Sequence, residues 1–190
     1  MTYTQEPVPT NRDGFFRKMR GGGTCPSCAC PAEILWSFIG AMGGIGLVAW
    51  LHRNVADPAG LSLLIGSFGA SAVLLYGAPQ SPLAQPRNLL GGHFLSALFG
   101  VSVRLLVPGP SWLACALAVA GAIALMHATG TLHPPGGATA LIAVTAGPKL
   151  ASLGYLFALI PALSGAAVML VVALVANNLA PGRRYPEYWL

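Results

Sequence analysis

Residues 129–140 read Thr-Gly-Thr-Leu-His-Pro-Pro-Gly-Gly-Ala-Thr-Ala, and this stretch decides how the chain can fold. Pro134 and Pro135 prevent one helix from running through it, because a proline disfavours the helical conformation of the residue before it. The apolar run that follows, residues 136–146, is about 16 Å long as a helix, which is half the thickness of a bilayer core. We therefore expect an extended segment at membrane depth, followed by a half-helix. Such backbone is tolerated there only where protein or a cavity surrounds it.

The composition places the rest of the chain in a membrane as well. Of the 190 residues, 55% are hydrophobic and 8% are charged. A soluble domain of this size carries about a quarter charged residues, so this chain lacks the polar side chains to cover a globular surface. The long runs of Ala, Leu, Ile and Val show no period of two, which argues against an outer-membrane β-barrel. The net charge of +5 is not arranged as a basic stripe with interleaved aromatic residues, so we expect no nucleic-acid partner.

The apolar runs predict an all-α polytopic protein with six membrane segments. The expected segments are residues 34–51, 61–76, 89–107, 112–126, 136–146 and 153–174. With six crossings and the N-terminus inside, the inner loops and tails hold more Arg and Lys residues than the outer loops, as the positive-inside rule requires. Five crossings would export the Arg183–Arg184 pair. We expect a bacterial inner-membrane protein with both termini in the cytoplasm.

Two similar motifs lie 68 residues apart and indicate an internal repeat. The first reads Gly-Ala-Ser-Ala at residues 69–72, and the second reads Gly-Ala-Thr-Ala at residues 137–140. A repeat with an odd number of spans inserts in opposite orientations, which is the inverted-repeat architecture of many secondary transporters. The predicted organisation is an N-terminal segment, two three-helix repeats and a C-terminal tail. Their bounds are residues 1–33, 34–109, 110–180 and 181–190.

The two motifs also predict a binding site. Each would begin a half-helix near the middle of the bilayer, in segments 2 and 5, and the two N-termini would face each other. A helix N-terminus presents unpaired N–H groups and about half a positive charge, so it attracts anions. The competing interpretation is that these small residues only allow helices to pack closely. The predicted substrate-binding residues are Gly69, Ala70, Ser71, His133, Gly136, Gly137, Ala138 and Thr139.

Two histidines carry open interpretations. His133 precedes the two prolines, and its imidazole would either donate to an anion, carry a co-transported proton, or form a hydrogen bond that pins the turn. His93, near the start of the third segment, is interpreted as a polar residue that helps helices to pack.

The N-terminal segment contains Cys25, Cys28 and Cys30. Thiolates at such spacing bind zinc or iron–sulfur centres, but three ligands are one fewer than the usual four. The alternative is a plain or acylated segment next to the membrane, and we predict no metal and no cofactor.

Catalysis finds no support in the sequence. All carboxylates lie outside the apolar segments, so none can pair with a histidine at membrane depth for acid–base chemistry. Ser71 with His133 or His93 is the formal exception, since a hydroxyl beside an imidazole is the arrangement of a serine hydrolase. We expect that the protein is not an enzyme. The five carboxylates are Glu6, Asp13, Glu33, Asp57 and Glu187.

The stretch 129–140 resembles the HPP family of integral membrane proteins, which is named for its His-Pro-Pro motif. Residues 66–72 and 84–93 match the same family, and the similarity covers about residues 33–180. Members from plants and cyanobacteria are associated with nitrite transport. The resemblance therefore implies transport of nitrite, or of a similar small monoanion, by a carrier rather than a channel. The alternative is a membrane-embedded regulatory or interaction module. The expected partners are the anion and the lipid bilayer, and a bundle this thin would suit a homodimer.

Overall fold

The computed structural model describes residues 19, 27–107, 109 and 111–190. The chain divides into two compact units, residues 1–30 and 31–190, and the fold described below is that of the second unit. In the first unit Cys28 and Cys30 are exposed, whereas Cys25 lies outside the described residues. The prediction about the three cysteines is therefore not addressed by the structure.

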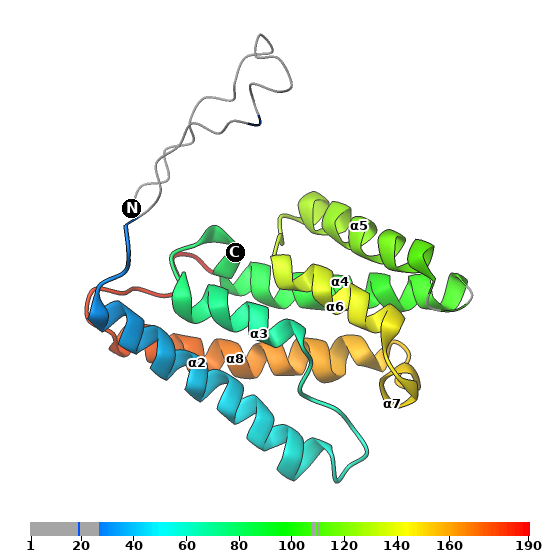
Figure 1. Cartoon of the computed structure of the whole chain (residues 1–190), viewed down its shortest axis with the longest axis horizontal. Coiled ribbons are helices and arrows are strands. Elements are labelled where there is room, and N and C mark those ends of the chain that lie inside the picture. The colour runs from blue at the N-terminus through cyan, green and yellow to red at the C-terminus, as the bar shows by residue number, and fades with distance from the viewer. Residues whose placement is uncertain (1–18, 20–26, 108, 110) are drawn as a thin grey trace. The chain divides into compact units, whose positions relative to one another are not determined.

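Every regular element in the described part of the second unit is helical, which confirms the all-α prediction (Figure 1). The longer helices are α2 (Pro31–Leu51), α4 (Pro86–Leu106), α5 (Trp112–Thr129), α6 (Pro134–Thr145) and α8 (Ser164–Leu179). The shorter helices and turns are η1 (His52–Ala56), α3 (Ser67–Ala72), η2 (Val73–Gly77), η3 (Pro82–Ala84), α7 (Pro148–Ala151) and η4 (Ala158–Leu163).

Among the described residues, four helical stretches are long and apolar enough to cross a membrane, namely Pro31–Ala56, Pro86–Leu106, Trp112–Thr129 and Ala158–Leu179. The stretch Ser67–Gly77 is apolar but shorter. The helix α6, with 12 residues, is also too short to cross alone. The all-α membrane fold is thus present.

Two expected segments differ from the observed helices. The segment expected at residues 61–76 becomes helical only near Ser67, and residues 61–65 have no regular structure. The segment expected at residues 153–174 is interrupted at Ile160, whose φ of −130° and ψ of 113° are not helical. The cause at Ile160 is Pro161, which disfavours the helical conformation of the residue before it.

Local sequence signals explain where the central helices begin and end. Pro86 and Pro134 each occupy the first turn of a helix, where the missing N–H costs no hydrogen bond. The helix α5 begins after Ser111, whose Oγ accepts a hydrogen bond from the N–H of Ala114. It ends at Gly130, which adopts the left-handed conformation (φ 65°) typical of helix ends.

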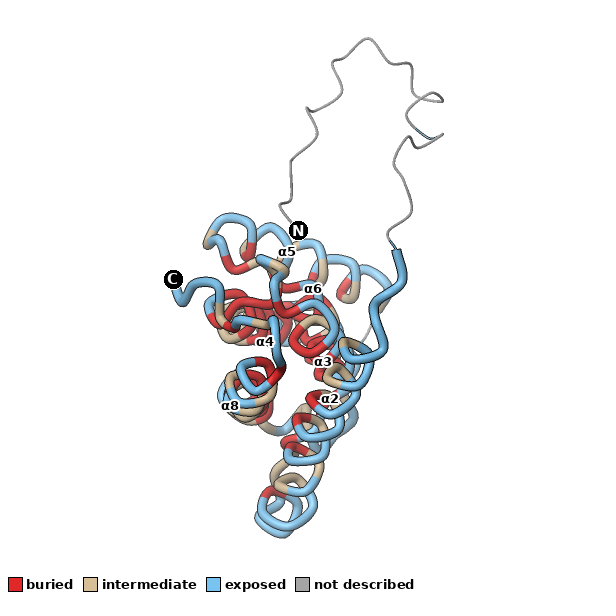
Figure 2. Tube along the Cα trace, turned by 90° about the vertical axis from the view of Figure 1, so that its left-hand side faces the viewer, coloured by how far each residue is buried: buried red, intermediate tan, exposed pale blue. Residues whose placement is uncertain are grey.

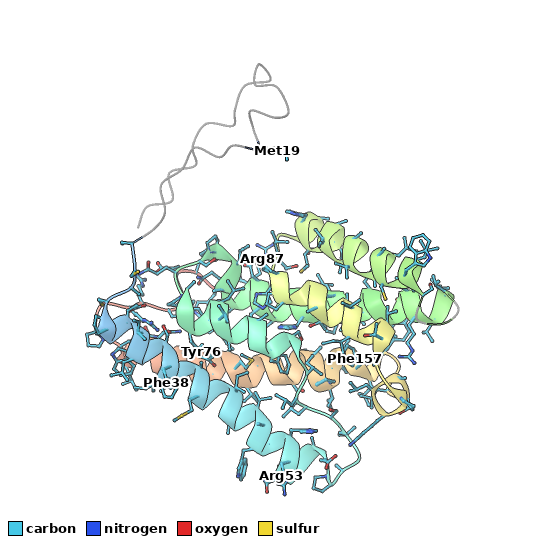
Figure 3. The ribbon with its side chains drawn as sticks, viewed as in Figure 1. Met19, Phe38, Arg53, Tyr76, Arg87 and Phe157 are labelled. Carbon is cyan, nitrogen blue, oxygen red and sulfur yellow. The ribbon has the colours of Figure 1, made fainter. Side chains whose placement is uncertain are left out.

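The helix α4 lies at the centre of the unit. It packs against α5 and α6, and also against η4 and α8, while α2 packs against α8 (Figures 1 and 2). Small residues allow α4 and α6 to approach closely. A Cβ atom on Gly100 would lie 2.6 Å from the carbonyl oxygen of Ala140. By contrast, the outer surface of α2 exposes large apolar side chains such as Phe38 (Figure 3), which suits contact with lipid tails.

The buried side chain of Arg183 connects the C-terminal residues to the rest of the unit through hydrogen bonds and an ion pair. The Arg183 guanidinium donates to the Oε1 atom of Glu33, to the Oγ atom of Ser37 at 2.9 Å and to the Oδ1 atom of Asn177 at 2.9 Å. It also donates to the backbone carbonyl of Tyr76 at 3.1 Å. This one side chain therefore links α2, the end of η2 and the end of α8.

Candidate functional site

Five buried polar side chains meet where α3, α4 and α6 come together, inside a bundle whose other buried residues are mostly apolar. Each of the five has a relative exposure of 0–1%. We call this group the polar cluster; its members are Ser67, Ser71, His93, His133 and Thr139.

Ser71 forms the middle of the polar cluster. Its Oγ atom lies 2.8 Å from Nε2 of His93 and 2.9 Å from Nε2 of His133, so one hydroxyl bridges two imidazoles. The two rings are tilted by 60°, with their centroids 5.1 Å apart. Because a hydroxyl has one hydrogen, at most one of these two hydrogen bonds uses the serine proton.

The polar cluster continues on both sides of this bridge. Thr139 Oγ1 lies 2.7 Å from Nδ1 of His93 and donates to Oγ of Ser67 at 2.9 Å. On the other side, Nδ1 of His133 lies 2.8 Å from the carbonyl oxygen of Leu83 in η3. A hydrogen-bonded chain thus runs from Ser67 through Thr139, both histidines and Ser71 to a backbone carbonyl.

Local structure places these side chains. Ser67 and Ser71 are four residues apart and therefore share one face of the helical stretch that begins with α3. His133 is held outside α6 in an extended conformation (φ −139°, ψ 104°), because Pro134 follows it. The Phe68 ring packs edge-on against His93, with centroids 5.3 Å apart.

Several of the backbone N–H groups that were expected to attract an anion are occupied. At the start of α3, the N–H groups of Phe68 and Gly69 donate to the carbonyls of Ile65 and Gly66. At the start of α6, Pro134 and Pro135 have no N–H, and Gly136 donates to the carbonyl of His133. These three backbone donors are therefore not available to a solute, and the polar side chains of the cluster are the other groups it would meet here.

Of the eight predicted substrate-binding residues, three belong to the polar cluster: Ser71, His133 and Thr139. Gly136 packs against α4, where an added Cβ atom would lie 2.7 Å from Oγ of Ser96. The other four do not reach the cluster: Gly137 and Ala138 line an apolar groove of about 400 Å³ beside α5, and Gly69 and Ala70 are exposed on α3. The predicted binding role of all eight stays a prediction.

The sequence reasoning did not select Ser67 or His93 as site residues. One signal for His93 was available. Gly92, Ser96 and Gly100 are spaced by four residues along α4, so this helix has a face of small residues next to His93. Such a face predicts that another helix packs closely against it. A histidine beside this face is then expected to be buried and to have a hydrogen-bond partner.

The charged groups of α4 bond backbone carbonyls and not the side chains of the polar cluster. Arg87 at the start of α4 (Figure 3) donates to the carbonyl of Thr129, and Arg104 near its end donates to the carbonyls of Ala143 and Ala146. No aspartate or glutamate occurs in α3, α4, α5, α6 or α8.

Elsewhere in the unit, Lys149 pairs with Asp57 at 2.6 Å, and this ammonium lowers the pKa of the Asp57 carboxyl. Within the part of the chain that the structure describes, no group of three or more His, Cys, Asp or Glu side chains could hold a metal ion.

Comparison with known proteins agrees with a membrane fold. The model of the family "HPP, transmembrane region" matches residues 26–186. Two transmembrane proteins of Dictyostelium discoideum are 48% and 45% identical to the chain over 92% of its length. The chain spans 63% and 57% of the lengths of these relatives. No solved structure matches the chain. Since the family model covers most of the sequence, this membrane protein belongs to the HPP transmembrane family.

Proposed function

We propose that the protein carries a small inorganic anion, nitrite first, across the membrane, and that the polar cluster is where the anion binds on its way. One observation carries the proposal: three hydroxyls and two imidazoles are buried together inside an apolar bundle. Polar groups in a membrane interior cost free energy and are typical of solute pathways. Hydroxyl and imidazole N–H groups are hydrogen-bond donors that suit a small anion.

The proposed architecture has six crossings in two inverted halves. In Figure 1, α3 and α6 both begin in the middle of the bundle and run toward opposite ends. Each would complete a crossing together with the non-helical residues before it, 61–66 and 131–133. The hydrogen bond between Thr139 and Ser67, 2.9 Å long, joins the two starts. This arrangement of opposed half-helices at a midplane site is the one found in transporters with inverted repeats.

A carrier fits the geometry better than a channel. The cluster side chains are fully buried, and within the described residues no buried side-chain N or O atom lacks a hydrogen-bond partner. An anion can therefore enter only if these hydrogen bonds exchange partners and the helices move apart. Such a movement, exposing the cluster first to one side and then to the other, is alternating access.

The charge pattern supports an orientation with both termini in the cytoplasm. Arg87, Arg183 and Arg184 all lie on the proposed inner side, whereas Arg53 and Lys149 lie on the outer side. An excess of Arg and Lys on the inner side is the usual topology signal.

Anion uptake into liposomes that contain the purified protein tests the proposal. We expect saturable uptake of nitrite, and we expect Thr139→Val to reduce the uptake rate about tenfold, which corresponds to about 1.4 kcal/mol. This substitution keeps the side-chain shape and removes the hydroxyl. Thr145→Val, on the exposed side of the same helix, is the matched control and should leave uptake unchanged.

Ser71→Ala and His133→Gln should reduce uptake at least as strongly as Thr139→Val, because the first removes the bridging hydroxyl and the second replaces the imidazole with an amide that cannot take up a proton. Nitrate, formate and chloride are the competing anions. If the folded protein takes up none of the four anions, the transport proposal is wrong, and the regulatory or interaction module becomes the better interpretation. If the cluster variants transport as well as the wild type, transport stands but the polar cluster is not its site.

The bridge at Ser71 also has the geometry of a serine nucleophile and its base. His133 Nε2 is 2.9 Å from the hydroxyl, and Nδ1 of the same ring faces a carbonyl that would orient it. We nevertheless propose that the protein is not an enzyme. Ser71 has a relative exposure of 0%, and its single hydroxyl is shared between two imidazoles.

A fluorophosphonate probe, which labels activated serines, should therefore not react with Ser71. Peptide mass spectrometry after incubation would measure this, with a soluble serine hydrolase in the same tube to prove that the probe is active. Labelling of the wild type that disappears in Ser71→Ala would contradict the expectation and indicate a hydrolase.

A further inference from the structure

The hydrogen bond between His133 and the carbonyl of Leu83 fixes where the protons of the polar cluster lie. The carbonyl oxygen of Leu83 accepts hydrogen bonds and cannot donate one, so the proton of this contact lies on Nδ1 of His133. A neutral imidazole has one N–H. Neutral His133 therefore presents an unprotonated Nε2 to Ser71, and Ser71 must donate to it.

The remaining bonds of the uncharged cluster follow from this one. Ser71 has given its hydrogen to His133, so Nε2 of His93 must donate to Ser71. Neutral His93 then has an unprotonated Nδ1, which receives the hydroxyl hydrogen of Thr139. Thr139 in turn accepts from Ser67, which reverses the direction that this contact has in the structure. All hydrogen bonds then run in one direction, from Ser67 to Leu83.

A second complete arrangement exists, in which the bonds from Ser67 to His133 run the other way. Thr139 donates to Ser67, as the geometry of this contact indicates. Nδ1 of His93 then donates to Thr139, Ser71 donates to Nε2 of His93, and Nε2 of His133 donates to Ser71. His133 still donates from Nδ1 to Leu83, so its ring carries two protons. This arrangement holds one proton more than the uncharged one.

One mixed arrangement is also complete. In it His93 holds both protons and donates to Ser71 and to Thr139. Thr139 then donates to Ser67 or to the carbonyl of Pro135, while Ser71 still donates to His133. His133 is the favoured host of the second proton, because one of its N–H groups donates to a backbone carbonyl, whereas both N–H groups of His93 would donate to hydroxyls. We infer that the polar cluster is a binding site for one proton, whose uptake reverses the hydrogen bonds from Ser67 to His133. Ser67 is the end that exchanges protons, since the other end closes on a carbonyl.

The step balances as a chain of proton transfers. A hydronium ion or a protonated acid gives a proton to Ser67, while Ser67 passes its own to Thr139 and Thr139 passes its own to Nδ1 of His93. The Nε2 proton of His93 moves to Ser71, and the Ser71 proton moves to Nε2 of His133. Each oxygen ends with one hydrogen, His93 stays neutral with its proton on the other nitrogen, and His133 becomes an imidazolium.

The surroundings determine what must accompany the proton. The charged groups on the neighbouring elements are Arg87 and Arg104 at the two ends of α4, which bond backbone carbonyls. The titratable groups are His127 and Cys115 on α5, and Tyr76 in η2, whose hydroxyl donates to the carbonyl of Met169. No carboxylate occurs in the helices that form the cluster. A buried imidazolium without a counter-charge is costly, so an anion in the cluster would stabilise the proton-loaded form. Resting on the proposed function, this predicts that anion and proton enter together.

Nitrogen-15 NMR of histidine-labelled protein in lipid nanodiscs tests the proton site without any transport. The chain has four histidines, and single His→Gln variants at positions 52, 127 and 133 assign all four signals. Near neutral pH we expect opposite tautomers, with the proton on Nε2 in His93 and on Nδ1 in His133. As the pH falls, or when nitrite is added, His133 should become an imidazolium while His93 remains neutral and its proton moves from Nε2 to Nδ1.

The tautomer change of His93 is the decisive signal, because histidines that merely pack would not show it. It should disappear in Ser71→Ala, and also in Thr139→Val, which serves if the first variant does not fold. Thr145→Val should retain it. Identical tautomers at neutral pH, a charge on His93, or a tautomer change that survives without the Ser71 hydroxyl would each overturn the inference.

Uptake measurements with a pH dye and a membrane-potential dye separate this inference from the proposed function. Nitrite uptake that acidifies the lumen and leaves the potential unchanged supports joint entry. If the tautomer change occurs but no anion is transported, the proton site stands and the transport proposal fails. If nitrite uptake carries net charge, the joint entry of anion and proton is wrong.

Discussion

Arg183→Gln is expected to lower the free energy of unfolding by about 3 kcal/mol, because it removes a buried guanidinium and leaves several of its hydrogen-bond partners unsatisfied. The Arg183 side chain is 3% exposed, whereas that of its partner Glu33 is 38% exposed. The substitution also removes the guanidinium N–H groups that donate to the carbonyl of Tyr76 and to the side chain of Asn177. The loss would loosen the junction between α2, η2 and α8.

Thermal unfolding in detergent micelles measures this effect, and Arg184→Gln is the matched control. Arg184 is the neighbouring residue, has the same charge and is exposed, so its replacement should change stability by less than about 0.5 kcal/mol. Equal melting temperatures of the two variants would show that the Arg183 contacts do not stabilise the fold.

Gly100→Ala is expected to destabilise the protein by about 3 kcal/mol, which is the upper end of the cost of overpacking a tight core. The added Cβ atom would lie 2.6 Å from the carbonyl oxygen of Ala140 and 2.9 Å from its Cα atom. Both are backbone atoms, so no side chain can rotate away, and α4 must separate from α6. Because Thr139 is the residue before Ala140, the same displacement would lengthen its contact with His93.

Gly46→Ala is the control for this substitution. Gly46 is an exposed residue of α2, and a Cβ atom there would meet nothing within 4 Å. Alanine favours the helix over glycine by up to about 1 kcal/mol, so this variant should be as stable as the wild type or slightly more stable. The two variants can be compared by thermal unfolding and by nitrite uptake. Gly100→Ala protein that melts and transports like Gly46→Ala protein would refute the close-packing argument.

Local chemistry made most helix positions predictable. Pro134 and Pro135 restrict the backbone whatever surrounds them, so the expected start at residue 136 differs from the observed start of α6 by two residues. The expected segment 89–107 and the observed α4, Pro86–Leu106, agree similarly well. Hydropathy alone predicted an apolar segment over residues 61–76, but only its second part is helical, since residues 61–65 have no regular structure.

The polar cluster was only partly predictable. Ser71, Thr139 and His133 stand out in the sequence because of the repeated motif and the adjacent prolines. Ser67 and His93 do not stand out. An isolated polar residue in an apolar segment can face lipid, pack in the core or belong to a site, and the rotation of its helix in the fold decides which. The sequence also did not predict that N–H groups at the helix starts are occupied, because their acceptors are carbonyls of the residues just before each helix.

The sequence by itself determined that this is an all-helical membrane protein with a break at the two prolines, because composition and proline chemistry act locally. The tertiary structure alone decided that one serine hydroxyl lies between two imidazoles contributed by residues 22 and 62 positions away. That contact depends on glycines that let α4 approach α6 and on the face that each helix turns toward the other. Those relations exist only between helices, and no single stretch of the chain specifies them.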